Sequence, residues 1–165
     1  MHSTVDSRAT LHKKPTNQNP ERTPKPVSRQ NSHETSNGEL VLIRGLPGSG
    51  KSTMARTFVS EGFLHFEADM FFEVAGQYQY EASRIQEAHN WCQNSARHAL
   101  TAGKRVVVSN TFTQLREIVP YFNMTQNVRV IEATGKWQNV HGVPIEMLNR
   151  MALRWEPLPG SLAQM

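Results

Sequence analysis

The feature that most constrains this chain is a glycine-rich pattern of eight residues that begins at Gly45. Residues 45–52 read Gly-Leu-Pro-Gly-Ser-Gly-Lys-Ser and match G-x-x-x-x-G-K-[ST], the phosphate-binding loop (P-loop) of nucleoside-triphosphate-binding proteins. Glycines in such a loop allow the backbone to turn successive N–H groups toward phosphate oxygens. Lys51 brings a positive charge to the β- and γ-phosphates, and the Ser52 hydroxyl is placed to bind Mg²⁺. The pattern predicts a nucleoside triphosphate with Mg²⁺, held by Gly45, Leu46, Pro47, Gly48, Ser49, Gly50, Lys51, Ser52 and Thr53.

The residues around this loop indicate an α/β fold. An apolar run at 40–43 predicts a strand that is buried on both faces, and the chain then alternates between helical and extended patterns. Such alternation implies a parallel sheet with right-handed crossovers, here a P-loop three-layer sandwich with about four strands. We expect strands at 40–43, 63–67, 105–109 and 128–132, the last at a sheet edge, and helices at 51–60, 81–101 and 144–155. We also expect a short helix that Thr113 caps and Pro120 interrupts or ends.

Composition divides the chain into three predicted parts. Residues 1–38 are rich in polar residues and proline, which predicts a disordered tail, idle or loosely tethering an acidic partner. Residues 39–159 form the expected P-loop domain, and residues 160–165 a short C-terminal tail. The single cysteine, Cys92, excludes an intramolecular disulfide, and the formal net charge of +4 is too small to argue by itself for nucleic-acid binding. No apolar run approaches the roughly 20 residues that cross a bilayer, so we expect a soluble, cytoplasmic protein.

Asp69 is the predicted catalytic carboxylate. It follows the second predicted strand, and ligands of open α/β sheets bind beyond the carboxyl ends of the strands. A carboxylate at this edge can take the proton from an attacking hydroxyl or hold a water of the Mg²⁺ shell, so Asp69 and Ser52 are the predicted metal residues. The alternative is an aspartate that caps the following turn. Glu67 could serve in place of Asp69, although strand alternation places it on the face opposite Ala68.

Arg150 and Arg154 are the predicted transition-state cations. They lie four residues apart on one face of the last predicted helix, opposite its apolar residues. A cation that reaches the γ-phosphate can accelerate transfer by about a thousandfold or more. The alternative is a solvated helix face, which binds nothing.

Four stretches of the chain together are typical of one group of kinases: 44–53, 88–92 (Ala-His-Asn-Trp-Cys), 108–113 (Val-Ser-Asn-Thr-Phe-Thr) and 141–144 (His-Gly-Val-Pro). Through them, residues 40–156 resemble the polynucleotide-kinase-like group of small P-loop kinases, which have an AAA-type ATP-binding domain. The resemblance implies that Lys51 and Ser52 contact phosphate and Mg²⁺, that Asp69 is the general base, and that residues 136–144 form a short lid over the nucleotide. The third strand of that group often ends in an aspartate where this chain has Ser109, and Met70, Phe71 and Phe72 stand where a second aspartate and an arginine often follow the base.

Three functional hypotheses follow from these residues. The first is an ATP-dependent phosphotransferase whose acceptor is a nucleic-acid 5′ end, a nucleotide or a small molecule. The second is an ATP-binding module without catalysis, which Ser109 and the absence of an arginine pair in the predicted lid favour. The third is a simple ATPase or GTPase, and the absence of the guanine-reading Asn-Lys-x-Asp tetrapeptide argues against the GTPase form.

Overall fold

The computed structural model describes residues 38–137, 142–160 and 162. All of them belong to one unit of the chain, His33–Met165. The predicted N-terminal tail and most of the predicted C-terminal tail lie outside the described residues, so both stay predictions.

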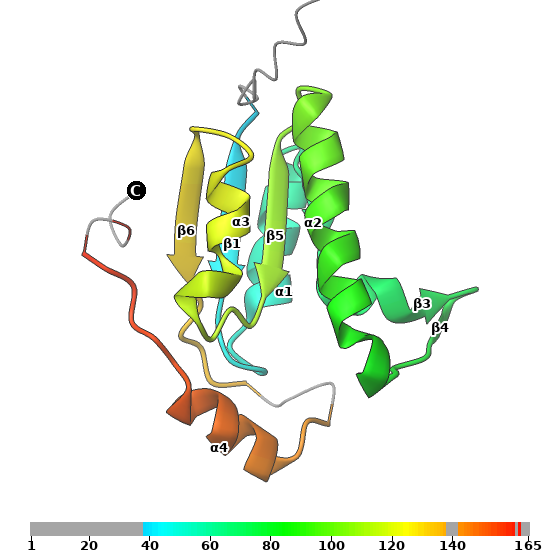
Figure 1. Ribbon diagram of the computed structural model, residues 1–165, viewed down its shortest axis with the longest axis vertical. Helices are drawn as coiled ribbons and strands as arrows, with labels where there is room; N and C mark the ends of the chain where they lie inside the picture. Colours follow the sequence, from blue (N-terminus) through cyan, green and yellow to red (C-terminus); the bar gives the residue numbers. More distant parts are fainter. Residues whose placement is uncertain (1–37, 138–141, 161, 163–165) are drawn as a thin grey trace, which may run out of the picture. The chain divides into compact units, whose positions relative to one another are not determined.

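A parallel four-stranded sheet forms the centre of the fold (Figure 1). Its order is β2-β5-β1-β6, and the central strand β1 pairs Leu40 with Val106 on one side and with Val128 on the other. The predicted fold class is confirmed, and so is the edge position of β6. The strands are β1 (Leu40–Arg44), β2 (Leu64–Phe66), β5 (Val106–Asn110) and β6 (Val128–Glu132).

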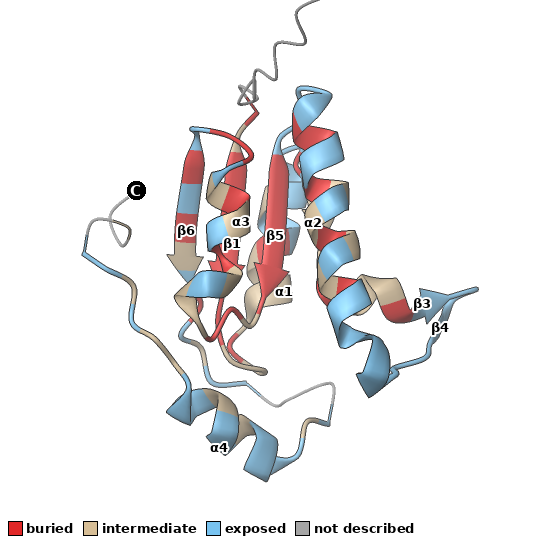
Figure 2. Ribbon diagram, in the orientation of Figure 1, coloured by how far each residue is buried: buried red, intermediate tan, exposed pale blue. Residues whose placement is uncertain are grey.

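Helices cover both faces of this sheet. On one face, Leu40 and Leu42 of β1 pack in a core with residues of α2 (Ile85–Thr101) and α3 (Val119–Phe122). On the other face, Val41 and Ile43 pack with Ala55 of α1 (Lys51–Ser60). Every residue of β1 and of β5 is buried (Figure 2). Full burial of one such aliphatic side chain contributes about 1.5–3 kcal/mol, so these two strands anchor whatever follows them.

Several predicted boundaries need correction. The long helix begins at Ile85, after the short 3₁₀ helix η2 (Ala82–Arg84), and Ile85 itself is 37% exposed. Thr113 does not cap the next helix, because Gln114 and Glu117 form a capping box on η3 (Leu115–Glu117). Pro120 does not end α3 but sits in its first turn, where the absence of an N–H has no cost.

Two short elements after β2 were not predicted from the sequence. The 3₁₀ helix η1 (Ala68–Phe72) leads into a hairpin of β3 (Glu73–Val74) and β4 (Gln77–Tyr78). Each strand of this hairpin has two exposed residues, too few for a period-two pattern to be visible. The hairpin projects from the side of the domain in Figure 1.

The last helix, α4 (Ile145–Leu153), has Pro144 as its N-cap rather than as its first helical residue, and none of its residues is buried. Figure 1 shows α4 beyond the carboxyl ends of β5 and β6, where the loop after β1 also lies. No helix in the described part of the chain is long and apolar enough to cross a membrane. The predicted cytoplasmic location stays a prediction.

Candidate nucleotide-binding site

The P-loop connects the buried strand β1 to helix α1. Gly50, the N-cap of α1, has a φ of 89°, a left-handed conformation that strains any residue with a Cβ. Gly45 is needed for a steric reason instead, because a Cβ there would lie only 2.7 Å from the carbonyl oxygen of Ala133 and would clash with it. The two positions explain why glycine is needed at both ends of the loop.

The segment after β6 packs against the outer side of the P-loop. Gly135 N–H donates to the Ser49 carbonyl at 3.2 Å, and Trp137 N–H donates to the Gly48 carbonyl at 2.8 Å. Both bonds fix the loop's carbonyl groups on the side of this segment. The N–H groups of Gly48 and Gly50 have no acceptor among the described residues, which suits a loop that presents its donors to phosphate.

Further polar groups of the loop fit a bound phosphate. Ser49 Oγ is buried and has no hydrogen-bond partner among the described residues. The first N–H groups of α1 have no intrahelical acceptor and carry the positive end of the helix dipole. Lys51 Nζ donates to the Leu46 carbonyl at 3.1 Å, so the amine lies folded over the loop. Burial lowers the pKa of Lys51, while the nearby carboxylates of Glu67 and Asp69 oppose this effect.

Glu67 lies at the meeting point of α1, β2 and β5. The Ser109 hydroxyl donates to Glu67 Oε1, and His65 Nε2 lies 3.1 Å from the same oxygen. His65 Nε2 is also 2.8 Å from Ser109 Oγ, so the three side chains form a closed triangle. Burial alone would raise the pKa of Glu67, but hydrogen bonds from His65, Ser109 and Ser52 outweigh it and lower the pKa to about 2. The carboxylate is therefore ionised, and the predicted Mg²⁺ ligand Ser52 is among the groups that lower its pKa.

Asp69 occupies the first turn of η1, half-buried at the same edge of the sheet. Asn110, at the end of β5, fixes the start of η1 because its Oδ1 accepts the Ala68 N–H at 2.9 Å. Tyr78 of the hairpin donates its hydroxyl to Asp69 Oδ1 at 3.3 Å. Partial burial, followed by the Asp69 carboxylate, raises the pKa of Tyr78 to about 12, so the phenol remains a donor. Asp69 thus connects the P-loop edge with the exposed hairpin.

Arg44, the residue before the P-loop, was not identified from the sequence as part of the site. Its side chain is fully buried, its Nη2 donates to the Glu156 carbonyl at 2.8 Å, and its guanidinium lies 3.9 Å from the centre of the Trp155 ring. Glu156 Oε2 also accepts the Leu115 N–H at 2.7 Å. The chain that leaves α4 is therefore tied to the strand that precedes the P-loop. The sequence did offer one signal for this role, an arginine directly after the apolar run at 40–43, since a buried arginine requires partners.

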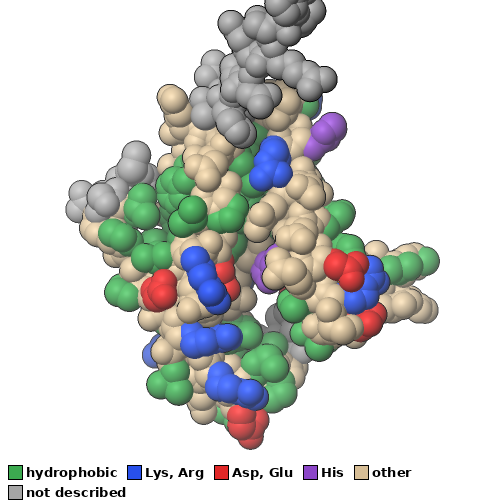
Figure 3. Space-filling model, in the orientation of Figure 1, with side chains coloured by type: hydrophobic (Ala, Val, Ile, Leu, Met, Phe, Trp, Pro, Cys, Tyr) green, Lys and Arg blue, Asp and Glu red, His purple; other side chains and the backbone are tan. Residues whose placement is uncertain are grey.

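Arg150 and Arg154 are exposed. Arg150 lies in α4, and Arg154 is its C-cap. Together with Met147, Met151 and Leu153 they line an open pocket of about 370 Å³ on this helix. Figure 3 shows basic side chains gathered over the α4 end of this face, beside a hollow that separates α4 from the hairpin side. No contact between these arginines and the P-loop is present among the described residues, and residues 138–141 of the predicted lid lie outside them.

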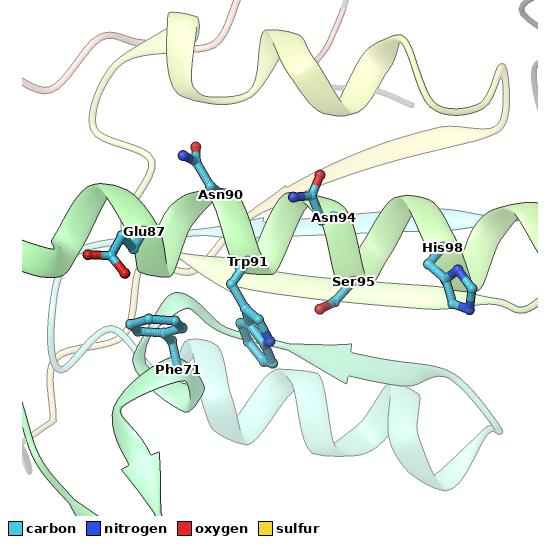
Figure 4. A pocket seen from close by; sticks show the side chains of 7 residues that line it. All are labelled: Phe71, Glu87, Asn90, Trp91, Asn94, Ser95 and His98. Carbon is cyan, nitrogen blue, oxygen red and sulfur yellow. The ribbon is translucent and has the colours of Figure 1, made fainter.

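A second open pocket lies along α2, away from the loop. Trp91 points from α2 toward Phe71 of η1, and their ring centres are 6.4 Å apart (Figure 4). The lining contains no lysine or arginine, which a triphosphate would need, so this pocket does not compete with the P-loop for nucleotide. Its residues are Phe71, Glu87, Asn90, Trp91, Asn94, Ser95 and His98.

Comparison with known proteins gives matches over the same part of the chain. A family model described as an AAA domain matches residues 40–134. NEDD4-binding protein 2 of Homo sapiens is 36% identical over 128 residues, which cover 68% of this chain and 7% of that protein. The uncharacterized protein PM0531 of Pasteurella multocida is 26% identical over 137 residues, covering 69% of this chain and 74% of that protein.

One solved structure has a similar fold at low sequence identity. A chain in the structure of a Pnkp1/Rnl/Hen1 complex superposes with a TM-score of 0.50 and 20% identity, over 70% of this chain and 39% of that chain. This chain thus spans only a small part of the human relative and less than half of the chain in that complex.

Proposed function

Because this chain belongs to the AAA domain family and carries a complete P-loop, we propose that it is an ATP-dependent phosphotransferase. It transfers the γ-phosphate of ATP to a hydroxyl acceptor, which is a nucleic-acid 5′ end, a nucleotide or a small molecule. The observation that supports this proposal is the position of Asp69. Its carboxylate is close enough to Lys51 to raise the pKa of that amine against the lowering by burial, and it accepts a hydrogen bond from Tyr78 of the exposed hairpin.

The residues of the site divide the chemistry among them. The N–H groups of the P-loop and of the first turn of α1 bind the phosphate oxygens, and Lys51 leaves the Leu46 carbonyl to contact the β- and γ-phosphates. Ser52, together with the carboxylates of Glu67 and Asp69 at the same edge of the sheet, would hold Mg²⁺. The bound ion supplies neutralisation of the charge that develops on the phosphate oxygens. Asp69 accepts the proton of the attacking hydroxyl, oriented by its hydrogen bond from Tyr78.

The experiment that tests this function is transfer of labelled γ-phosphate from ATP with Mg²⁺. Two acceptor pools are offered, one of 5′-hydroxyl oligonucleotides and one of nucleosides, nucleotides and small alcohols. We expect label on one pool and a loss of about a thousandfold in Lys51→Ala, because this variant lacks the charge on the transferring phosphate. Lys104→Ala, which changes an exposed lysine after α2, is the matched control and should retain full transfer. Equal transfer by wild type and Lys51→Ala would refute the proposal.

The second candidate is an ATP-binding module without phosphoryl transfer. The observation that favours it is the exposure of Arg150 and Arg154, which leaves the described site with Lys51 as its cation at the phosphates. Binding of ATP without label on either pool would support this candidate, and release of free phosphate alone would indicate a simple ATPase.

A further inference from the structure

The carboxylate of Glu67 has contacts that its neighbour Asp69 lacks. Its Oε1 accepts from the Ser109 hydroxyl and lies 3.1 Å from His65 Nε2, and a hydrogen bond from Ser52 also contributes to the lowered pKa of this carboxylate. The side chain of Glu67 is 15% exposed and that of His65 is 13% exposed, so this group is held inside the edge of the sheet. Asp69, by contrast, is bound by Tyr78 of the exposed hairpin.

The strand order explains why these side chains meet. β2 pairs with β5 in parallel, with Phe66 opposite Val108, so the chain positions that follow these two residues lie side by side. Those positions are Glu67 and Ser109. The end of β5 itself carries only the neutral side chains Ser109 and Asn110. Glu67 therefore supplies the negative charge at the point where β2, β5 and the start of α1 converge.

The donor set around Ser52 suits Mg²⁺ bound together with nucleotide. Mg²⁺ keeps several of its waters and is usually held by one or two carboxylates together with substrate phosphates. Among the described residues no group of three His, Cys, Asp or Glu side chains could hold a metal by itself. A site made of Ser52, the phosphates and one adjacent carboxylate agrees with both facts.

We propose that Glu67 is the carboxylate that holds the water shell of the Mg²⁺ at Ser52, with Ser109 and His65 as the residues that fix its orientation. The inference rests on the proposed function, since it needs a nucleotide and Mg²⁺ at the P-loop. It separates the roles of the two carboxylates: Glu67 serves the metal, and Asp69 serves the acceptor. Glu67 is a positioning residue in this scheme, because it acts through bound water and Ser52 rather than on the transferring phosphate.

Calorimetric titration of the full chain with a non-hydrolysable ATP analogue, in Mg²⁺ and in EDTA, tests the proposal. The ratio of the two affinities is the Mg²⁺-dependent gain. We expect Glu67→Gln to lower this gain by about tenfold or more, as loss of residues around a metal site typically does, with unchanged or tighter binding in EDTA. Glu73→Gln, an exposed glutamate on the hairpin, is the matched control and should keep the wild-type gain.

Moving the carboxylate gives a sharper test. The double variant Glu67→Ser with Ser109→Asp moves the carboxylate from position 67 to position 109, on the other side of the same contact. It should therefore recover most of the Mg²⁺-dependent gain that Glu67→Gln loses. Ser109→Ala keeps the carboxylate but removes the hydroxyl that contacts both Glu67 and His65, and we expect the Mg²⁺-dependent gain to fall a few-fold. This variant also tests the proposal if Glu67→Gln fails to fold.

Two results would overturn the assignment. One is a wild-type Mg²⁺ gain in Glu67→Gln, or in Ser109→Ala if Glu67→Gln does not fold. The other is an equal loss of affinity with and without Mg²⁺, which would show a structural role for Glu67. Failure of the wild-type protein to bind the analogue at all would instead refute the proposed function, and the inference with it.

Discussion

The P-loop and α4 lie at the same end of the sheet but are held in different ways. The P-loop follows the fully buried strand β1 and is bonded from outside by the N–H groups of Gly135 and Trp137. Helix α4 has no buried residue, and Leu153 and Ile145 are 87% and 64% exposed. An element with so few buried contacts can shift at low free-energy cost, whereas the P-loop cannot. The phosphate cradle is thus formed before the nucleotide binds, whereas α4 is connected to the sheet through Trp155 and Glu156, the residues that follow it.

Among the variants outside the P-loop, the largest effect on transfer should come from Asp69→Asn, which tests whether phosphate transfer can be lost without loss of nucleotide binding. The variant keeps the shape of the side chain but removes the base, so transfer should fall by about a hundredfold or more. ATP affinity should change little, since the hydrogen bond of Asp69 comes from Tyr78 of the hairpin rather than from the P-loop N–H groups. Labelled-phosphate transfer and calorimetry measure the two quantities. An equal loss of transfer and of ATP affinity would contradict the separation.

A smaller effect should follow from removing the cations of α4. If this helix closes over the nucleotide, Arg150→Ala or Arg154→Ala should lower the transfer rate by about tenfold or more, because a cation at the γ-phosphate stabilises the transferring charge. Thermal stability should not change, since within the described ranges the Arg150 side chain makes only a 3.4 Å hydrogen bond, to the Glu146 carbonyl of the same helix. Arg97→Ala on the exposed side of α2 is the control. Wild-type transfer in both α4 variants would mean that α4 is a solvated face.

A third effect is on stability rather than on rate, and it concerns Glu67 beside the P-loop. The pKa of Glu67 is lowered to about 2 from 4.5, so its contribution is fully present above pH 4.5 and is lost as the pH falls toward 2. The shift is equivalent to about 3 kcal/mol at most. Glu67→Gln lacks this contribution, so the difference in unfolding free energy between wild type and variant should shrink between pH 5 and 2. Denaturant unfolding without nucleotide or Mg²⁺ measures it. A difference that does not change with pH would show that the hydrogen bonds of Glu67 do not depend on its charge.

Much of the fold could be predicted because its signals are local. The apolar run at 40–43, the helix 51–60 and the edge strand at 128–132 were all found near their predicted positions. The AAA-type ATP-binding domain that the resemblance implied is confirmed by the match of an AAA-domain family model over residues 40–134. The errors fall where the pattern is short or interrupted. The hairpin strands have two residues each, and Gln114 took the capping role expected of Thr113.

Glu67 was named from the sequence only as an alternative to Asp69, and its surroundings could not be predicted in this way. Alternation along the strand placed it on the face opposite Ala68, but β2 ends at Phe66 and the period-two rule does not continue beyond it. Glu67 is the extended N-cap of η1, where the chain turns toward β5. Arg44 was overlooked for a related reason, because its partners at Trp155 and Glu156 are more than a hundred residues away in the sequence.

The sequence by itself determined the phosphate cradle, since nine consecutive residues carry the donors, the lysine and the hydroxyl, and a strand and a helix flank them on either side. Only the tertiary structure decided which carboxylate lies beside Ser52 and what holds it. The strand order β2-β5-β1 brings residues 52, 67 and 109 together, and strand order is set by the packing of helices on both faces of the sheet rather than by any local pattern.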